Sequence, residues 1–406
     1  MNPRVNEGAN RSALLAWACG LYLAHILLQG KIALSELSAF WAIFCLGWAI
    51  ARGEARFSFH ILYYPLLVYG AASTLSALAA SRRIHQGAEG MLWFKMLIFP
   101  AALILFRHFP KLRERTIWAH AIFAAGIATW GLFQFVFLDR RDLEHRIQGP
   151  STHVMTFSGL LLPLSLMFLL LWWHERKPWQ LVVTLVVTLT LLLTFTRSVW
   201  LGWVAAAATV LLMTRARARI ALYALPVLIL FVTFLPLSLF SRLMSTFDTS
   251  QSSNFDRIRM VEAGVEMIRD HPLLGVGPAN VKEVYPLYRR QDAPRPRPPH
   301  LHNNVVQLWA ERGILGLAAY VLLLTLFLRE CARARRGPQR MWGEIGIAVA
   351  VSLTVAGLFE FNFGDTEVFY LMLNLFALVV ASSEELAEQP EPRTNELRTP
   401  LVATSA

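Results

Sequence analysis

The sequence predicts an all-α, polytopic integral membrane protein with about twelve transmembrane helices. Of its 406 residues, 55% are hydrophobic and only 16% are charged. A soluble domain of this length would carry more charge and shorter apolar runs. Apolar runs long enough to cross a hydrocarbon core of about 30 Å recur along the whole chain. The run "LVVTLVVTLTLLLTFT" is one example.

The candidate spans follow one another along the chain, and each boundary is set to within a few residues. They are 13–30, 35–51, 59–80, 90–106, 116–138, 154–173, 179–195, 198–213, 219–239, 302–328, 342–360 and 366–383. The chain therefore divides into helices 1–9 over 1–239, a loop over 240–301, helices 10–12 over 302–384 and a tail over 385–406 that is predicted to be disordered. Basic connectors such as "RHFPKLRER" place one face, with both termini, in the cytoplasm.

The connector over 240–301 is far longer than the others and is predicted to lie on the non-cytoplasmic side. Loops of this length usually have a function or are disordered. "DRIRMVEAGVEMIRDHP" reads as an amphipathic helix followed by a turn at Gly275 and Gly277, with Arg257 and Arg259 flanking its apolar face. The residues predicted for that face are Ile258, Val261, Val265 and Ile268. A helix lying on the bilayer with solvated arginines explains this pattern as well as ligand binding does.

The stretch "PHLHNNVVQLWAERGILG" places polar groups where the tenth span begins. Gly313 follows His302 by eleven residues, about three helical turns, so the two are expected to share a face. Glycines on that face would let another helix approach and fix the direction of His302. A neutral imidazole here could accept a proton from a sugar hydroxyl. An interfacial histidine that bonds to lipid or loop backbone fits the spacing equally well.

Arg197 interrupts an apolar stretch that runs from Leu181 to Met213. A single helix of that length would measure about 50 Å, so the chain must turn back, and Arg197 is expected at the outer start of the eighth span. An arginine at a helix N-terminus opposes the macrodipole, and such violations tend to mark functional sites. Arginine with free helix N–H groups suits phosphate. Leu201 would pack inward one turn later, and the alternative role for Arg197 is snorkelling to headgroups.

Other polar residues give weaker signals. Arg146 and His153, in the outer loop between spans five and six, could join the same cluster, although such loop residues usually serve solubility. Lys95 and Glu360 lie in or beside predicted spans, where ionisable groups are costly. We expect a mutual ion pair or a headgroup contact to explain both.

Several classes of function are not indicated. No zinc-ligand spacing, phosphate-binding loop, dinucleotide fingerprint or nucleophile elbow appears. The three cysteines are widely spaced and indicate neither a disulfide framework nor a metal site. The net charge of +11 fits the orientation charge of a membrane protein. We therefore expect no metal, no cofactor and no nucleic-acid partner.

Three elements in this order carry a resemblance to a known family. Arg197-Ser-Val-Trp-Leu201 matches an R-x3-L motif at the start of a span, and His302 with Gly313 matches an H-x10-G motif. Arg257, fifteen residues before Pro272, matches an arginine of a large periplasmic loop. Together they resemble the O-antigen ligase and polymerase superfamily of bacterial inner membranes. The likeness is specific over roughly 190–320 and otherwise extends only to topology.

The resemblance implies an activity and roles for the site residues. A ligase of this family takes a glycan from undecaprenyl pyrophosphate and joins it to a sugar of lipid A–core, completing lipopolysaccharide by metal-independent, inverting transfer. His302 would deprotonate or orient the acceptor hydroxyl, with Leu201 and Gly313 supporting the site. Arginines would hold the pyrophosphate and offset charge on the leaving group. These arginines would be Arg197 and Arg257, assisted by Arg259 and Arg146.

Other functions remain open at this point. An O-antigen polymerase uses the same donor with another lipid-linked glycan as acceptor, and a protein O-oligosaccharyltransferase uses a protein hydroxyl. The H-x10-G spacing favours the ligase. A lipid-linked glycan flippase or a solute transporter would need charged groups along a mid-membrane path or inverted repeats. Here the polar groups gather at one predicted face, and no repeat is visible.

Overall fold

Every element in the described part of the chain is a helix. The computed structural model describes residues 12–80, 94–140, 145–214 and 252–385. The helices are α1 (Ala13–Leu27), α2 (Ile32–Ala51), α3 (Tyr63–Ala79), α5 (Ile98–His108), α6 (Lys111–Phe137), α7 (Val154–Glu175), α8 (Pro178–Leu193), α9 (Arg197–Met213), α12 (Ser252–Asp270), α13 (Val281–Tyr288), α14 (Asn304–Arg336), α15 (Arg340–Ala356) and α16 (Thr366–Glu385). The predicted span 219–239 and most of the predicted tail lie outside these residues.

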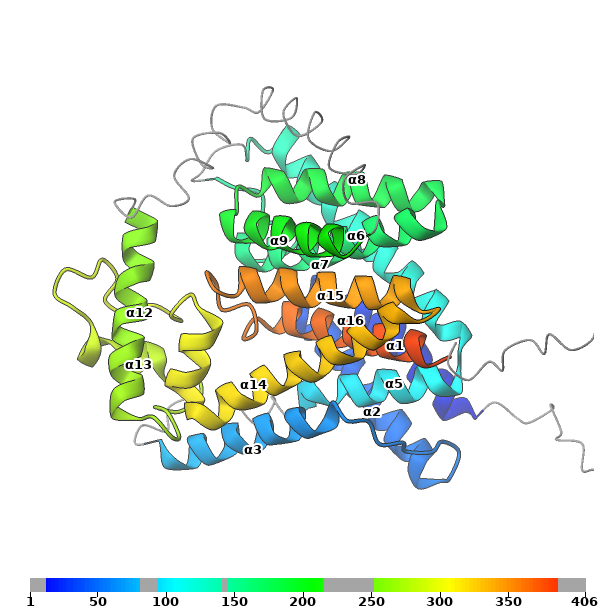
Figure 1. Cartoon of the computed structure of the whole chain (residues 1–406), viewed down its shortest axis with the longest axis horizontal. Helices are drawn as coiled ribbons and strands as arrows, with labels where there is room; N and C mark the ends of the chain where they lie inside the picture. Colours follow the sequence, from blue (N-terminus) through cyan, green and yellow to red (C-terminus); the bar gives the residue numbers. More distant parts are fainter. Residues whose placement is uncertain (1–11, 81–93, 141–144, 215–251, 386–406) are drawn as a thin grey trace, which may run out of the picture.

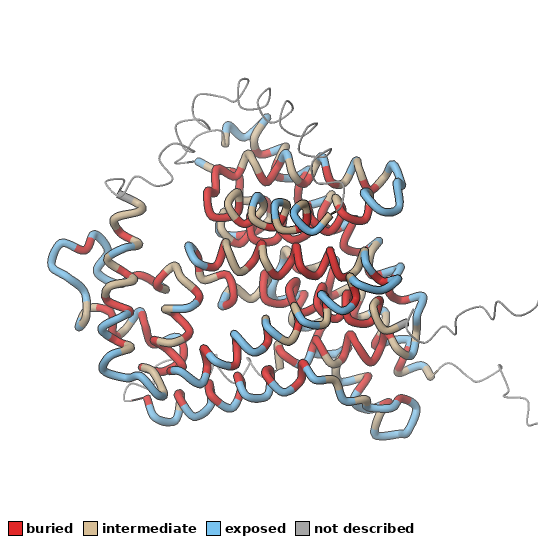
Figure 2. Tube along the Cα trace, in the orientation of Figure 1, coloured by how far each residue is buried: buried red, intermediate tan, exposed pale blue. Residues whose placement is uncertain are grey.

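Most of the helices lie side by side, while α12 and α13 stand across one end of the bundle (Figure 1). The main contacts join α1 with α2, α7 with α8, α9 with α15, and α14 with both α3 and α15. Within the most apolar windows, 83% of α7 and α16 is buried, against 28% of α2. The core of the bundle therefore lies around α7 and α16, and buried residues concentrate in the middle of the bundle (Figure 2). By contrast, α2 exposes large apolar side chains such as Phe40, Trp41 and Phe44.

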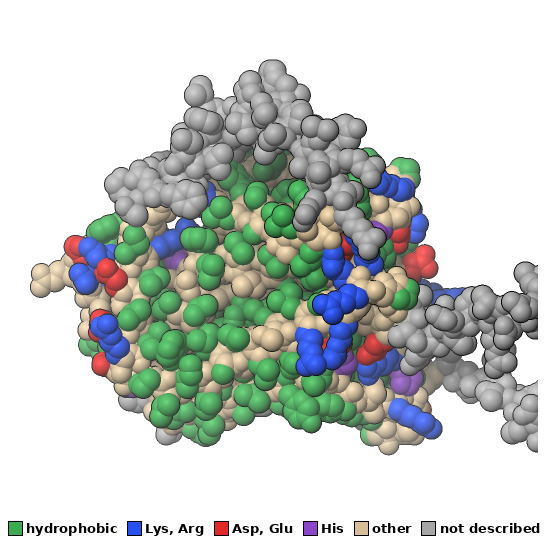
Figure 3. All heavy atoms as spheres, viewed as in Figure 1, with side chains coloured by type: hydrophobic (Ala, Val, Ile, Leu, Met, Phe, Trp, Pro, Cys, Tyr) green, Lys and Arg blue, Asp and Glu red, His purple; other side chains and the backbone are tan. Residues whose placement is uncertain are grey.

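Five described helices are long and apolar enough to cross a membrane. They are α2, α6, α7, α14 and α16. Three shorter apolar helices, α1, α8 and α9, lie among them. Hydrophobic side chains cover the middle of the visible surface, while Lys and Arg gather toward its ends (Figure 3). This distribution is typical of a protein whose middle faces lipid and whose ends face water.

The predicted amphipathic helix is present as α12, but a different face of it is buried. Met260, Ala263 and Met267 form a small core with α13 and the start of α14, whereas Ile258 and Val265 are 39% and 37% exposed. The apolar pattern indicated the helix correctly. The prediction of its buried face was wrong, because packing against α13 and α14 selects a different stripe.

The predicted tenth span is a helix that breaks at Gly313. Its φ of 66° and ψ of −171° lie where only glycine is comfortable. The Ile314 N–H donates to the Pro272 carbonyl at 3.0 Å, and a Cβ on Gly313 would lie 1.9 Å from the Leu273 oxygen. The glycine therefore makes room for the loop after α12. This corrects the expected close approach of another membrane helix and the straight helical face shared with His302.

Candidate functional site

One end of the bundle gathers the starts of α9 and α14, the loop between α15 and α16, and the helix α12. Alternating helix directions bring these segments together, because α9, α14 and α16 all begin at the end where α12 lies (Figure 1). Glu360, in the loop between α15 and α16, lies at the centre of this arrangement and is 8% exposed.

His302 is held directly against Glu360. Its Nδ1 lies 2.8 Å from the Glu360 Oε2, and the His300 Nε2 lies 3.4 Å from the Oε1 of the same carboxylate. His302 precedes the first residue of α14 by two positions and has a φ of 53°, which turns the chain sharply before the helix. When Nδ1 donates to the ionised carboxylate, Nε2 is left with the lone pair that can accept a proton.

The two asparagines after His302 fix this geometry. The Asn303 side chain accepts a hydrogen bond from the Val306 N–H at 3.0 Å and so caps α14. The Asn304 Nδ2 donates to the Asn362 Oδ1 at 2.7 Å, and the Asn304 Oδ1 accepts from the Phe363 N–H at 3.2 Å. The start of α14 is thereby tied to the loop that carries Glu360, which accounts for polar residues at the mouth of an apolar helix.

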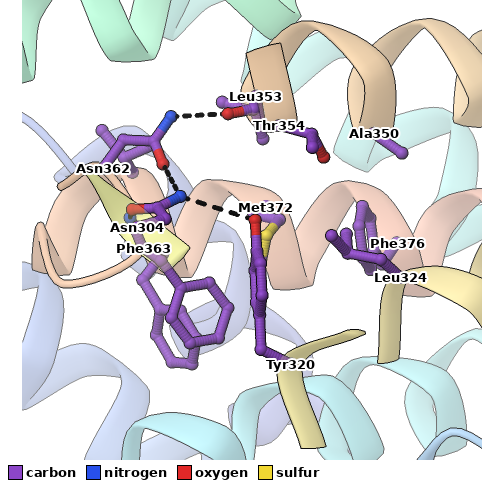
Figure 4. Close-up of a pocket in the computed structure, with 12 residues that line it drawn as sticks. Asn304, Tyr320, Leu324, Ala350, Leu353, Thr354, Asn362, Phe363, Met372 and Phe376 are labelled. Carbon is purple, nitrogen blue, oxygen red and sulfur yellow. Dashed lines mark hydrogen bonds between the residues drawn. The ribbon is translucent and has the colours of Figure 1, made fainter. Parts of the chain in front are cut away.

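A small cavity of about 10 Å³ lies beside this network (Figure 4). Asn304, Asn362 and Tyr320 line one side, and the Asn304 Nδ2 reaches the Tyr320 hydroxyl at 3.5 Å. The remaining lining is largely apolar and comes from α14, α15 and α16. A space of this size holds one water molecule at most. The cavity therefore belongs to the support of the site and is too small for a sugar.

Two of the predicted arginines, Arg197 at the start of α9 and Arg257 in α12, lie at this end of the bundle. The Arg257 Nη2 lies 3.9 Å from the Glu360 Oε2, the oxygen that His302 contacts. Arg197 is 5% exposed and donates through Nη2 to the Asn254 Oδ1 at 2.7 Å and to the Ser253 hydroxyl at 3.1 Å. Since residues 253 and 254 lie one turn before Arg257, both guanidinium groups meet the first turns of α12.

Arg295 adds a third guanidinium that the sequence analysis did not single out. It comes from the Pro-rich segment before His300, and its Nε lies 2.9 Å from the Asp256 Oδ2. Its charge lowers the pKa values of both His300 and Arg257, although burial is the larger cause for each. The adjacent prolines masked the signal, because "QDAPRPRPPH" reads as a linker.

Other predicted residues have contacts elsewhere in the structure. Arg259 forms ion pairs with Glu262 at 2.7 Å and Asp292 at 2.5 Å. The Arg146 carbonyl accepts from Arg140 at 3.3 Å. Leu201 is half-buried, so its expected inward packing is incomplete. The assignment of Arg259 and Arg146 to the pyrophosphate stays a prediction.

Glu360 is the main site residue that sequence reasoning missed. The expected mutual pair with Lys95 is wrong, because the Lys95 Nζ lies 3.3 Å from Glu36 and 2.7 Å from the Thr366 hydroxyl. Glu360 instead meets His302 and Arg257. One signal could have identified it: an acidic residue in the short loop before the last span, on the same predicted side as His302.

Burial and charge act in opposite directions on the carboxylate. Burial alone would raise the pKa of Glu360, but the hydrogen bond with His302 and the charges of His302, His300 and Arg257 together lower it. Burial lowers the pKa of His300 to about 4, against the opposing effect of Glu360. At neutral pH the site therefore holds an ionised Glu360, a neutral His300 and at least two guanidinium groups.

His300, His302 and Glu360 also present ligand atoms within 4.8 Å of one another, as a metal site would. Two contacts disfavour that use. The Arg257 cation lies 3.9 Å from the carboxylate, and the His300 Nδ1 accepts from the His302 N–H at 3.4 Å, which favours a proton on the Nε2 that a metal would need. The arrangement suits imidazole–carboxylate hydrogen bonding better than metal ligation.

Comparison with known proteins bears on the same region. The family model described as O-antigen ligase matches residues 181–321, which run from α8 to the middle of α14 and include Arg197, Arg257 and His302. No curated protein matches the chain. The apolar helices and this match indicate a multi-pass membrane protein. Over residues 181–321, the chain is therefore similar to the O-antigen ligase family.

Proposed function

We propose that this protein is an O-antigen ligase. It would transfer a glycan from undecaprenyl pyrophosphate to a sugar of lipid A–core at the periplasmic face of the inner membrane, completing lipopolysaccharide. One observation carries the proposal: His302 and Arg257 meet the same oxygen of Glu360, at 2.8 and 3.9 Å. A general base and an anion-binding group are thus held at one point, as transfer from a diphosphate requires.

The proposed chemistry uses His302 as the base. Its Nδ1 donates to Glu360, and its Nε2 takes the proton from the acceptor hydroxyl as that oxygen attacks the anomeric carbon. The bond from this carbon to the phosphate oxygen breaks, and undecaprenyl pyrophosphate leaves with the bonding electrons. Glu360 stabilises the imidazolium that forms. A single displacement of this kind inverts the anomeric centre.

The arginines would bind the diphosphate and offset the charge that develops on it. Guanidinium groups present N–H donors in a fixed fork that fits phosphate oxygens. Arg197, the first residue of α9, donates to Asn254 in the first turn of α12, and Arg257 follows in the next turn of α12, so a diphosphate bound by both would join α9 to α12. Because these cations would offset the charge on the leaving diphosphate, the proposed reaction uses no metal.

The alternatives differ mainly in the acceptor. A polymerase or a protein O-oligosaccharyltransferase would use the same donor and the same base, and the H-x10-G spacing favours the ligase. A flippase or transporter would need charged groups along a mid-membrane path. The site residues named here gather at one end of the bundle instead, which supports an enzyme.

The test is a transfer assay with purified protein and labelled undecaprenyl-pyrophosphate glycan, in EDTA and without nucleotide. Lipid A–core, a second lipid-linked glycan and a peptide are offered as separate acceptors. We expect product on lipid A–core only. Product on either other acceptor would instead identify one of the alternatives, and glycan that only crosses the bilayer would contradict an enzyme.

His302→Ala should remove this product, since the proposed base is then absent. His271→Ala, an exposed histidine at the end of α12, is the matched control and should leave turnover unchanged. Arg197→Lys keeps the charge but loses the fork, so activity should fall steeply. Normal turnover in His302→Ala would exclude His302 from the chemistry.

A further inference from the structure

A crevice lies at the opposite end of the bundle from His302. Its volume is about 440 Å³, within the range of about 300–1,000 Å³ typical of ligand sites. It is lined where α6 begins, where α7 turns into α8, where α15 begins and where α16 ends. The proposed function uses none of these residues, so the crevice stands independently of it.

The apolar part of the lining is rich in tryptophan. Trp118 and Trp179 stack with ring centroids 4.2 Å apart, and Trp342 lines the crevice with them. Tryptophan concentrates at the level of lipid headgroups, where an apolar ring with one polar edge fits best. Lys and Arg gather on the visible surface at this end of the bundle (Figure 3). Both features place the crevice at the headgroup level.

The polar part of the lining contains two cations and two anions. Arg113 and Lys177 are the cations, and Glu114 and Glu175 are the anions. Arg113 is 8% exposed, and its Nη1 donates to the Ala381 carbonyl at 2.8 Å. Lys177 and Glu175 lie 2.8 Å apart. The four charges sum to zero, so a ligand with net charge would leave one charge uncompensated in a partly dehydrated site.

We propose that this crevice binds the headgroup of a phosphatidylethanolamine molecule. Its phosphate would lie toward Arg113 and Lys177, and its ammonium would donate hydrogen bonds to Glu114 and Glu175 and lie near the tryptophan rings. A phosphatidylglycerol headgroup carries the phosphate without a cation and meets two carboxylates. A phosphatidylcholine headgroup has a cation without N–H donors. Only the primary amine satisfies both sides of the lining.

The experiment measures lipid binding to the purified full-length protein by native mass spectrometry. Phosphatidylethanolamine, phosphatidylglycerol and phosphatidylcholine with identical acyl chains compete in equal amounts. We expect phosphatidylethanolamine to bind roughly five- to tenfold more tightly, since one mispaired charge at a headgroup depth costs about that factor. Soluble phosphoethanolamine should compete for the site, and inorganic phosphate should not.

Variants of the lining residues test whether the preference for phosphatidylethanolamine arises in this crevice. Glu114→Gln and the double variant Glu114→Gln/Glu175→Gln leave the crevice with a net positive charge. The lipid preference should therefore shift from phosphatidylethanolamine toward phosphatidylglycerol. Glu114 is exposed, which makes the single variant tolerable for folding. Glu330→Gln, which removes the ion-pair partner of the exposed Arg333 on α14, is the control and should change nothing. Equal binding of the three lipids, or a wild-type preference for phosphatidylglycerol, would overturn the proposal.

Discussion

Glu360 illustrates how a buried charge is retained at a functional site. Burial opposes ionisation of this carboxylate, and three neighbouring cationic or imidazole groups lower its pKa nonetheless. A buried charge without a partner destabilises the fold. The ionised Glu360 carboxylate between His302 and Arg257 therefore indicates that the cluster acts as a unit. In the proposed reaction, Glu360 is a positioning residue that sets the direction of the His302 ring.

Replacing Glu360 with Gln should lower kcat roughly 10- to 100-fold, since a misdirected base loses part of the factor of about 10²–10⁴ that general-base catalysis contributes. The KM for the acceptor should change little, because Glu360 does not contact it in the proposed mechanism. Steady-state transfer kinetics separate the two effects. Glu266→Gln, an exposed carboxylate on α12 paired with Arg269, is the control. A change in KM alone would remove Glu360 from the positioning of the base.

Arg295 and Arg297 provide a matched pair on one Pro-rich segment. Arg295 contacts Asp256 beside Arg257, so Arg295→Gln should raise the KM for the lipid-linked donor several-fold and leave the acceptor KM unchanged. Arg297 is exposed and should tolerate the same change. Arg295→Lys keeps the ion pair with Asp256 and should bring the KM for the donor back toward that of the wild type. Equal KM values for the Arg295 and Arg297 variants would contradict a role for Arg295 at the donor.

Among the elements, the break in α14 has the clearest consequence. The Val276 and Gly277 N–H groups donate to the Ala310 and Glu311 carbonyls at 2.8 and 3.0 Å, so the loop after α12 is bonded to α14 just before Gly313. The contact between this loop and α14 matters for the site, because α12 carries Arg257 and α14 follows His302. The hydrogen bonds between this loop and α14 therefore fix the position of Arg257 relative to His302.

Gly313→Ala should separate these elements. An alanine would need a φ that it adopts with strain on the order of 1–3 kcal/mol, and its Cβ would overlap the Leu273 carbonyl. We expect a lower Tm and a loss of transfer, measured on detergent-purified protein. Gly126→Ala lies in α6 with no atom near its Cβ and should keep both properties. A Gly313→Ala protein with normal activity would show that the contact between this loop and α14 does not position the site.

The sequence predicted most of the elements and only part of their geometry. Apolar runs indicated the helices, and "HPLLGVG" indicated the turn in which Gly275 and Gly277 adopt φ values of 70° and 104°. The break at Gly313 could not be predicted, since a glycine inside an apolar run fits a continuous helix equally well. Likewise, α12 presented two usable apolar stripes, and tertiary packing chose between them.

The same limit applies to the candidate site at the scale of the whole molecule. His302, Arg197 and Arg257 could be singled out because each departs from the local rules of an apolar span or begins a motif. Glu360 stood out only as a costly ionisable group beside a span and Arg295 not at all, because their roles in the cluster depend on which loops meet at one end of the bundle. That meeting results from the alternating directions of helices that are far apart along the chain, such as α9 and α16, and no local pattern encodes it.

The central claim is that donor binding and proton removal are carried by different residues at one end of the bundle. It is tested most directly by measuring donor affinity and turnover together, with undecaprenyl-pyrophosphate glycan, for His302→Ala and Arg257→Gln. We predict that His302→Ala binds the donor with a Kd within about twofold of wild type and forms no product, while Arg257→Gln weakens binding roughly tenfold or more. Loss of donor affinity in His302→Ala together with unchanged affinity in Arg257→Gln would contradict the account.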